Sequence, residues 1–382
     1  MKEKNIEDKI YINYGTDYKK MTIDLMEKAK INEDLNPKMK VVIKPNLILP
    51  SPAKNGATTH SEIVEAIIIY LQKNKIKDIS IAEGAWVGVK NTYESFKVCG
   101  YEKLKKQYNV NLIDTKKEET THYNVKGIDF NICKIFKEAD YLINVPVLKG
   151  HCQTKLTCCM KNLKGCIPDK DKRYYHTIGL HDPIAILTKL IKPNLNIVDS
   201  ICGDLDYEEG GNPIPTNRIL LSKDPLLMDS YCAKLIAYNP EEIEYLKKAK
   251  NLNIGNIHSN KTELIELNKQ NKSKKQIIKS KKAKPLEKYI KEDSACSPCY
   301  ANLIHGINKL NNKEKLNNYK INIGQGFKEY NPSDPYKKLN NDYNDDKEKI
   351  AIGIGNCCNK FTKNLKGCPP SGLEILNFLN SL

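Results

Sequence analysis

The chain has 382 residues, a formal net charge of +16 and a hydrophobic content of 40%. This length allows one to three domains and a large buried core. The positive charge suits an anionic substrate or partner protein, a membrane surface or nucleic acid. Arginine occurs only at Arg173 and Arg218, however, and base-specific readout of nucleic acid depends on bidentate arginine. Nucleic acid is therefore a poor candidate partner, and a compositional bias toward lysine is the simpler explanation of the charge.

The N-terminal sequence MKEKNIEDKIYINYG is charged and has no apolar h-region, so no signal peptide is predicted. No run in the sequence approaches the roughly 18 apolar residues that a spanning helix requires. A cytoplasmic protein without a membrane span is therefore expected. The 13 cysteines of such a protein are not expected to form disulfides. They are either core residues or ligands of a metal or cluster.

Taken in chain order, the sequence alternates between strand and helix patterns. Short apolar runs predict strands at residues 10–13, 40–49, 79–82, 110–113, 141–148, 195–198 and 218–222. Amphipathic segments predict helices at residues 18–29, 63–72, 93–99, 102–107, 154–163, 182–190, 226–237 and 241–249. The alternation is typical of an α/β fold with a mostly parallel sheet flanked by helices. We assign it to a core domain over residues 1–255.

The sequence changes character after this core. Residues 256–293 are lysine-rich and predict a linker or surface arm, with an electrostatic docking arm for nucleic acid or an acidic redox partner as the alternative. Residues 294–382 predict a smaller α+β module. Its expected elements are helices at 301–310 and 373–382, strands at 320–323 and 350–354, and a polar loop over 330–348.

Polar side chains follow several of the predicted strands. Because the carboxyl ends of parallel strands meet at one edge of a sheet, these side chains are expected to converge. The lysines make that edge cationic, which suits a carboxylate or phosphate, and the histidines and acids suit proton transfer. The candidate catalytic residues are Lys149, His151, Lys161 and Glu83, and the candidate ligand-binding residues are Lys44, Asn46, His60, Asn162 and Asp199.

The C-terminal module carries a cysteine pattern that suits a metal centre. Cys296 and Cys299 form a CxxC pair, and Cys357 and Cys368 follow far downstream. Four thiolates from separate segments are what a [4Fe–4S] cluster needs. A structural zinc is the alternative, although its usual second CxxC pair is absent. Cys358 is the substitute for Cys357 as a ligand.

The remaining cysteines are predicted to be core residues rather than a second metal site. Buried free cysteine is an ordinary small apolar residue. This prediction covers Cys99, Cys133, Cys152, Cys158, Cys159, Cys166, Cys202 and Cys232.

The segments VVIKPN and PVLKGH, followed by KNLKG, resemble the signature of the domain-of-unknown-function family DUF362. The resemblance covers roughly Val41 to Ala237, and the cysteine module resembles that of some members, which are often described as iron–sulfur proteins. Cys357 matches the cysteine that follows a Gly-Asn strand end in those members. The family label gives no reaction. Gly210-Gly211-Asn212-Pro213 departs slightly from the Gly-rich loop that the family tends to have there.

That loop belongs to an acidic segment, CGDLDYEEGGNPIP, which has no regular ligand spacing, so a solvated loop is expected rather than a cation site. Other site motifs are missing. The sequence has no GxxxxGK[ST], no GxGxxG between a strand and a helix, and no GxSxG. P-loop ATPases, Rossmann-type dehydrogenases and serine hydrolases are disfavoured.

The leading hypothesis is an iron–sulfur oxidoreductase or electron-transfer protein. Its core would bind a small anionic substrate, and its cluster would exchange electrons with that site and with a partner protein. A second hypothesis is a non-enzymatic binding protein stabilised by a cluster or zinc. A third is an isomerase. A Thr-His before a helix and a Lys-His at a later strand end resemble the lactate-racemase family, which uses a nickel-pincer nucleotide held by Lys and His contacts.

Overall fold

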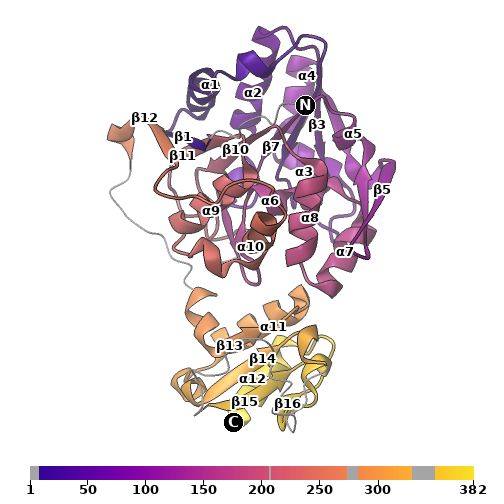
Figure 1. Cartoon of the computed structure of the whole chain (residues 1–382), viewed down its shortest axis with the longest axis vertical. Helices are drawn as coiled ribbons and strands as arrows, with labels where there is room; N and C mark the ends of the chain where they lie inside the picture. Colours follow the sequence, from indigo (N-terminus) through magenta and orange to yellow (C-terminus); the bar gives the residue numbers. More distant parts are fainter. Residues whose placement is uncertain (1–7, 206–207, 273–282, 329–348) are drawn as a thin grey trace. The chain divides into compact units, whose positions relative to one another are not determined.

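The computed structural model describes residues 8–205, 208–272, 283–328 and 349–382, which divide into two compact units. The first unit comprises Met1–Arg173 and His181–Lys279, and the second comprises Tyr174–Leu180 and Ser280–Leu382. In Figure 1 the first unit runs from indigo to orange and the second is mostly orange and yellow.

The first unit is built on an eight-stranded sheet in the order β12-β1-β11-β10-β7-β2-β3-β4. Every neighbouring pair is parallel except the two pairs that involve β11, which runs antiparallel to β1 and β10. The strands are β1 (Lys9–Tyr14), β2 (Lys40–Pro45), β3 (Asp78–Glu83), β4 (Asn111–Asp114), β7 (Tyr141–Val145), β10 (Leu195–Ser200), β11 (Arg218–Ser222) and β12 (Glu263–Leu267). The predicted α/β fold with a mostly parallel sheet is confirmed.

Helices cover both faces of this sheet (Figure 1). One group comprises α1 (Tyr18–Lys28), α2 (Ser61–Lys73), α3 (Thr92–Val98) and α4 (Tyr101–Tyr108). The other comprises α6 (Cys159–Asn162), α8 (His181–Ile191), α9 (Pro225–Leu235) and α10 (Glu244–Asn251). The remaining helices of the chain's first half are α5 (Lys134–Lys137) and α7 (Asp169–Ile178), and the division between the two units passes through α7.

The alternation of side chains along each strand decides which residues enter the core. Val41 and Ile43 of β2 pack with residues of α1 and α2 in one large hydrophobic cluster. Successive side chains of a strand point to opposite faces, so Lys44 points toward the other layer, where α6 lies. The same alternation buries Ile143 of β7 with α1 and α2 and turns Asn144 toward α6.

The order of the strands in the sheet changes direction beside β2. The chain passes from β2 through β3 to β4 on one side of β2, whereas β7 and β10 lie on its other side. Strand order therefore reverses between β2 and β7. In open α/β sheets, ligands bind outside the carboxyl ends of the strands at such a reversal.

The prediction for the segment after β7 needs correction. The single helix expected over residues 154–163 is instead a hairpin, β8 (Lys149–His151) and β9 (Lys155–Thr157), followed by the short helix α6. Lys155 has a φ of 64°, a left-handed conformation that an α-helix cannot contain. A second hairpin, β5 (Thr120–Val125) and β6 (Ile128–Cys133), was not predicted at all.

The segment expected to be a linker differs in part from that expectation. Residues 263–267 form β12, which adds to the edge of the large sheet by pairing with β1, and residues 290–292 form β13 of the second unit. Its lysine-rich centre, residues 273–282, lies outside the described residues.

The second unit contains a four-stranded sheet whose pairs are all parallel, in the order β13-β14-β15-β16. Its strands are β13 (Ile290–Glu292), β14 (Tyr319–Ile323), β15 (Ile350–Ile354) and β16 (Lys363–Leu365), and its main helices are α11 (Ser297–Lys309) and α12 (Gly372–Ser381). α11 and α12 approach closely at Gly306, where a Cβ atom would lie 2.8 Å from Ile375. The loop predicted at 330–348 lies outside the described residues.

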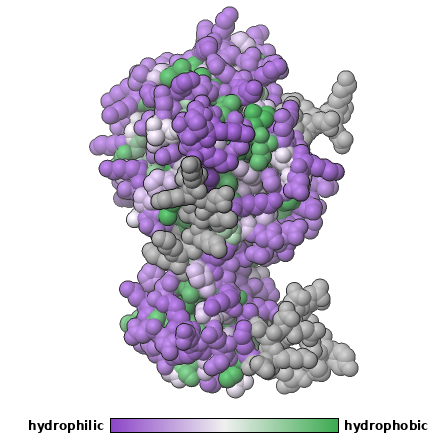
Figure 2. All heavy atoms as spheres, turned by 90° about the vertical axis from the view of Figure 1, so that its left-hand side faces the viewer, coloured by the Kyte–Doolittle hydropathy of each residue, from purple (hydrophilic) through white to green (hydrophobic). Residues whose placement is uncertain are grey.

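The face of the chain drawn in Figure 2 is mainly hydrophilic, with small scattered hydrophobic areas. Among the described residues, no helix has the length and apolar character needed to cross a membrane.

Candidate functional site

A row of polar side chains crosses three neighbouring strands of the large sheet. Lys44 of β2 is in register with Asn144 of β7, and Asn144 is in register with Asn196 of β10. All three residues are fully buried. Asn144 donates from Nδ2 to Asn196 Oδ1 at 3.0 Å and accepts at Oδ1 from Asn162 of α6 at 2.8 Å. The row and α6 therefore form one continuous polar layer inside the unit.

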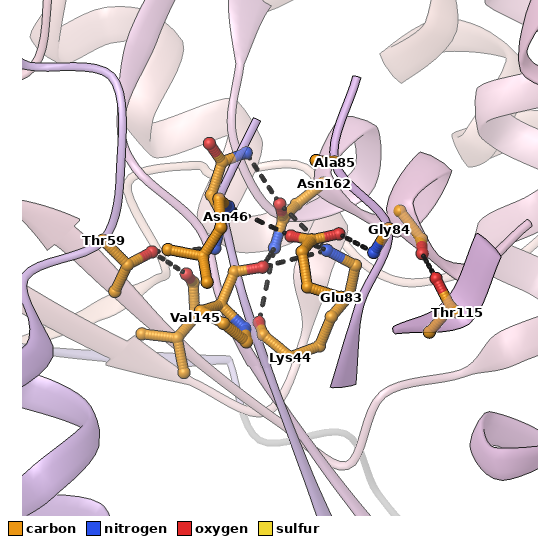
Figure 3. A network of polar contacts seen from close by, with 12 residues as sticks. Lys44, Asn46, Thr59, Glu83, Gly84, Ala85, Thr115, Val145 and Asn162 are labelled. Carbon is orange, nitrogen blue, oxygen red and sulfur yellow. Dashed lines mark hydrogen bonds and ion pairs between the residues drawn. The ribbon is translucent and has the colours of Figure 1, made fainter. Parts of the chain in front are cut away.

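At the end of β2, Lys44 forms a buried ion pair with Glu83 of β3 (Figure 3). The Lys44 ammonium lies 2.9 Å from Glu83 Oε2 and also donates to the carbonyl of Pro45 at 3.0 Å and to Asn162 Oδ1 at 3.3 Å. The two Glu83 oxygens accept from the backbone amides of Leu47 and Gly84. Both charges are thus fully bonded, as burial requires.

Gly165 explains part of the KNLKG motif. A Cβ atom at this position would lie 2.0 Å from Glu83 Oε1 and 2.6 Å from Lys44 Nζ. The Gly165 carbonyl also accepts from the Thr115 hydroxyl at 3.0 Å. Glycine is required here because the backbone passes directly over the ion pair.

Lys149 is the second buried lysine at this edge. Its ammonium donates to Asn46 Oδ1 at 3.1 Å, to the Ala57 carbonyl at 2.7 Å and to the Glu208 carbonyl at 2.9 Å. Asn46 in turn donates to Asn162 at 2.8 Å, so it joins Lys149 to the polar layer. Burial lowers the pKa of Lys149 to about 8, and the positive charge of Lys161 contributes to the decrease.

Glu208 carries the negative charge at the outer part of the site. Its carboxylate bonds to the ammonium of Lys161 and lies 3.5 Å from His151 Nε2. Burial alone would raise the pKa of Glu208, but Lys161, His151 and Lys149 outweigh it and hold that pKa well below its usual range. The loop expected to be solvated therefore places one carboxylate inside the cationic cluster. Asp204 of the same loop is also fully buried.

His151 is held in one neutral form. Its Nδ1 atom accepts from the backbone amides of Gln153 at 3.1 Å and Thr154 at 3.0 Å. In the neutral ring the proton is therefore on Nε2, which faces Glu208. Burial lowers the pKa of His151 to about 4, and Lys161 adds to that decrease. At neutral pH this ring is a hydrogen-bond donor and is not a base at Nδ1.

Two further lysines that sequence reasoning did not select extend the cluster. Burial lowers the pKa of Lys164 to about 7, and Lys161 acts in the same direction. Lys172 donates to the carbonyls of Gly84 at 2.9 Å and Ala85 at 3.1 Å. The only sequence signal for Lys164 was its place in the KNLKG motif, and Lys172 had none.

His60 and Asp199 lie on the face of the sheet that packs against α1 and α2. His60 precedes α2, and Asp199 is near the end of β10. Their side chains meet at 2.8 Å between Nδ1 and Oδ2. Asp224, another polar residue that follows a strand, caps α9 by accepting from Leu226 and Leu227 and has no contact with this site.

The nine candidate site residues thus form two groups. Seven of them share the network around Lys44, Lys149 and Glu208, and His60 and Asp199 form a separate pair. Their catalytic and ligand-binding roles stay predictions.

In the second unit, the four predicted cluster cysteines interact electrostatically, although their sulfurs are not among the groups of described ligand atoms that all lie within 4.8 Å of one another. Burial raises the pKa of Cys299 to about 12, and Cys296, Cys358, Cys357 and Cys368 contribute to the increase. Hydrogen bonds join the two loops that carry Cys357 and Cys368, because Asn356 N donates to the Gly367 carbonyl at 2.9 Å. A bound cation would stabilise these thiols in their thiolate form. Four cysteine ligands therefore fit an iron–sulfur cluster or zinc.

Cys358 differs from Cys357 in its surroundings. Cys358 is fully buried in a hydrophobic cluster with Phe327 and Phe361, and its thiol donates to the Gly324 carbonyl at 3.8 Å. Cys357 is partly exposed. These surroundings favour Cys357 over Cys358 as a ligand.

Three other residues bring potential metal ligands together in the first unit. The ligand atoms of Cys158, Cys159 and Asp229 all lie within 4.8 Å of one another, and all three residues are buried. Asp229 already accepts from the backbone amides of Cys159 at 2.7 Å and Met160 at 3.1 Å. The carboxylate thereby stabilises the start of α6, which agrees with the prediction that these cysteines belong to the core.

Fold and site together define an α/β protein with a buried lysine cluster at the strand ends of its sheet. The chain belongs to the family described as Domain of unknown function (DUF362), whose model matches residues 41–234. The thylakoid-associated protein sll1697 of Synechocystis sp. is 26% identical over an alignment of 223 residues that covers 55% of this chain and 66% of that protein. The chain thus spans slightly less than two thirds of that relative.

Two solved structures are similar to parts of this chain. The lactate racemase apoprotein from Thermoanaerobacterium thermosaccharolyticum gives a TM-score of 0.41 at 16% identity, covering 59% of this chain and 57% of that one. A protein from Thermotoga maritima gives 0.38 at 14% identity, covering 63% and 60%. Likeness at this level carries no functional argument.

Proposed function

We propose that this chain is an iron–sulfur protein that binds a small anionic ligand at the strand ends of its first unit. The cluster of the second unit, held by Cys296, Cys299, Cys357 and Cys368, would supply one-electron transfer. The proposed activity is that of an oxidoreductase or electron-transfer protein.

A single observation carries the anionic-ligand part of this proposal. The carboxylate of Glu208 is bound by Lys161 and His151, and the backbone carbonyl of the same residue is bound by Lys149. The site therefore already holds a carboxylate of the protein itself. A ligand carboxylate or phosphate that replaced Glu208 would meet one ammonium directly and a neutral imidazole donor beside it. Charge-assisted bonds of this kind are the stronger class of hydrogen bond.

Sulfate is a suitable probe of the site because its charge does not change across the working pH range. We expect millimolar sulfate to raise the melting temperature of Glu208→Gln more than that of the wild type, because the variant removes the competing carboxylate. Glu209→Gln is the matched control, since it removes the same charge from the adjacent residue. Equal sulfate effects in all three proteins would count against an anion site at Lys161 and His151.

The cluster part of the proposal rests on the four cysteines of the second unit, which interact electrostatically. Cysteine thiolates bind the iron atoms of a cluster, and burial opposes the ionisation of Cys296 and Cys299 unless a cation is bound. Lys161 and Glu208 belong to the other unit, so the two parts of the proposal can be tested separately.

The cluster test measures iron, inorganic sulfide and the reduced-state EPR signal of anaerobically purified full-length protein. We expect wild type and Cys358→Ala to contain the cluster, and Cys296→Ser and Cys357→Ser to lose it. Cys358→Ala is the matched control because it removes the adjacent thiol of the same loop. If the purified protein contains one equivalent of zinc and no iron, the metal site of the second unit has a structural role and not a redox role.

A further inference from the structure

A cysteine that the sequence analysis assigned to the core lies beside the His60–Asp199 pair. The sulfur of Cys202 is 3.8 Å from His60 Nε2. The other ring nitrogen, Nδ1, is 2.8 Å from Asp199 Oδ2. Cys202, His60 and Asp199 thus form a chain of contacts in the order thiol, imidazole, carboxylate.

The fold fixes each member of this chain. Asp199 is fully buried near the end of β10, where Oδ2 also accepts from the His60 backbone amide at 2.8 Å and Oδ1 accepts from Ile201 N at 3.1 Å. His60 is the residue before α2, and the edge of the Tyr18 ring packs against it with centroids 5.4 Å apart. The imidazole therefore has one ring nitrogen committed to Asp199 and the other directed to the thiol.

Close backbone packing positions Cys202. A Cβ atom on Gly56 would lie 2.7 Å from the Cys202 carbonyl, and one on Gly203 would lie 1.8 Å from the Leu148 carbonyl. The backbone from the Cys202 carbonyl to Gly203 is therefore packed tightly. The Cys202 thiol donates to the Ala53 carbonyl at 3.6 Å, and the residue is only partly buried.

We propose that Cys202 is a nucleophile that accepts an acyl group from an activated acyl compound such as a thioester, with His60 as its proton partner and Asp199 as the positioning residue. A thiol, an imidazole within hydrogen-bond reach and a group that orients the imidazole are the elements of covalent acyl transfer. This role goes beyond the proposed anion binding and electron transfer and depends on neither.

The reaction balances without any further reactant. In the resting pair the proton is on His60 Nε2 and the sulfur is a thiolate. The Cys202 thiolate forms a bond to the acyl carbon, and the bond from that carbon to the leaving group breaks. The leaving group takes the electron pair of the broken bond and the proton from Nε2. Water then attacks the S-acyl carbon and loses a proton to His60, and the carboxylic acid and the thiolate are released, which restores the resting pair.

The charge state of the imidazole supports this arrangement. Burial would lower the pKa of His60, but the charge and hydrogen bond of Asp199 outweigh it and raise that pKa to about 11. A positively charged ring beside a sulfur favours its thiolate form. The other titratable groups near this chain of contacts are Tyr18 of α1, Tyr101 of α4 and Glu62 of α2. Burial raises the pKa of both tyrosines, so they stay uncharged.

The first test measures the iodoacetamide labelling rate of Cys202 in the full chain by residue-resolved mass spectrometry. An ion-paired thiolate should react at nearly the same rate, within about twofold, at pH 6 and pH 8. In His60→Gln, whose folding is checked by circular dichroism, the rate should rise about tenfold per pH unit, as for an ordinary thiol. Cys152, whose pKa burial raises to about 12, is the internal reference and should also rise tenfold per unit.

The wild-type profile decides the proposal without any variant. If the labelling rate of Cys202 in the wild type rises tenfold per pH unit, Cys202 is not an activated thiol and the proposal is wrong. Asp199→Asn should shift the pH profile toward that of His60→Gln, whereas an unchanged profile would remove the positioning role of Asp199.

The second test uses p-nitrophenyl acetate as the acyl donor. We expect a burst of p-nitrophenolate and an S-acetyl group on Cys202 in the wild type, with neither in Cys202→Ser. If the labelling rate of Cys202 does not change with pH but Cys202 is not acetylated, acyl compounds are not the substrate class.

Discussion

The ammonium of Lys44 lies 2.9 Å from a carboxylate oxygen of Glu83, and the two side chains are 0% and 4% exposed. They come from adjacent parallel strands and meet directly beneath the backbone of Gly165. This pair anchors the strand-end site, because Asn162 and the loop after β2 bond to the same two side chains.

Removing one partner of this pair is expected to destabilise the protein strongly. Lys44→Met leaves the Glu83 carboxylate buried without its counter-charge, which costs about 3–5 kcal/mol of unfolding free energy. Urea denaturation of the full chain measures this loss. Lys20→Ala is the control because its exposed pair with Asp24 should contribute little. Equal losses in the two variants would contradict the importance of the buried pair.

Gly165→Ala should disturb the same pair without changing any charge. The added methyl group would lie 2.0 Å from Glu83 Oε1, so the carboxylate or the backbone has to move. Overpacking of this kind costs about 1–3 kcal/mol. Gly372→Ala is the matched control, since its nearest neighbour would be at an ordinary 3.5 Å. A lower melting temperature for Gly372→Ala than for Gly165→Ala would contradict this account.

His151 should stay neutral across the physiological range. Its pKa of about 4 lies below the ordinary value of 6.5, so the unfolded chain binds this proton first as the pH falls. The contribution of His151 to stability is therefore complete above about pH 6.5 and is lost between pH 6.5 and pH 4. Nitrogen-15 NMR should find a single neutral ring with its proton on Nε2. Titration of this ring near pH 6.5 would show that the site is solvated.

Sulfate binding by Glu208→Gln should weaken as the pH rises. Burial lowers the pKa of Lys149 to about 8 and that of Lys164 to about 7, while the charge of Glu208 raises both. Without Glu208 both lysines lose their positive charge at lower pH than in the wild type. Calorimetric titration between pH 6 and pH 9 measures the decline. A constant affinity over that range would mean that neither lysine contributes to anion binding.

Local sequence patterns predicted much of the first unit. The strand predicted at residues 40–49 ends at Pro45 in the structure, and the helix predicted at 63–72 spans Ser61–Lys73. Both follow from the pattern of their apolar residues. The helix predicted at residues 226–237 corresponds to α9, and the structure adds that Asp224 caps it, since a side-chain acceptor followed by proline suits a helix N-terminus. The convergence of Lys44, Glu83 and Lys149 also followed from the sequence, since strand ends of a parallel sheet share one edge.

Other features depended on contacts between residues far apart in the chain. The segment 154–163 has a helical pattern of apolar residues, yet Lys155 to Thr157 pairs with Lys149 to His151 as a hairpin. β12 contains charged residues and still forms a strand because the edge of β1 accepts it. Neither pairing is visible in a local window, because the partner strand supplies the hydrogen bonds.

The sequence by itself determined the α/β class, the position of most helices and strands, and the edge at which the lysines gather, because these depend on side-chain periods of two and 3.6 residues. Only the tertiary structure decided that Glu208 enters the lysine cluster, that Cys202 faces His60, and that Cys358 is buried while Cys357 is partly exposed. These outcomes depend on how loops without regular structure pack against distant strands, and loop sequences carry no period from which such packing can be predicted.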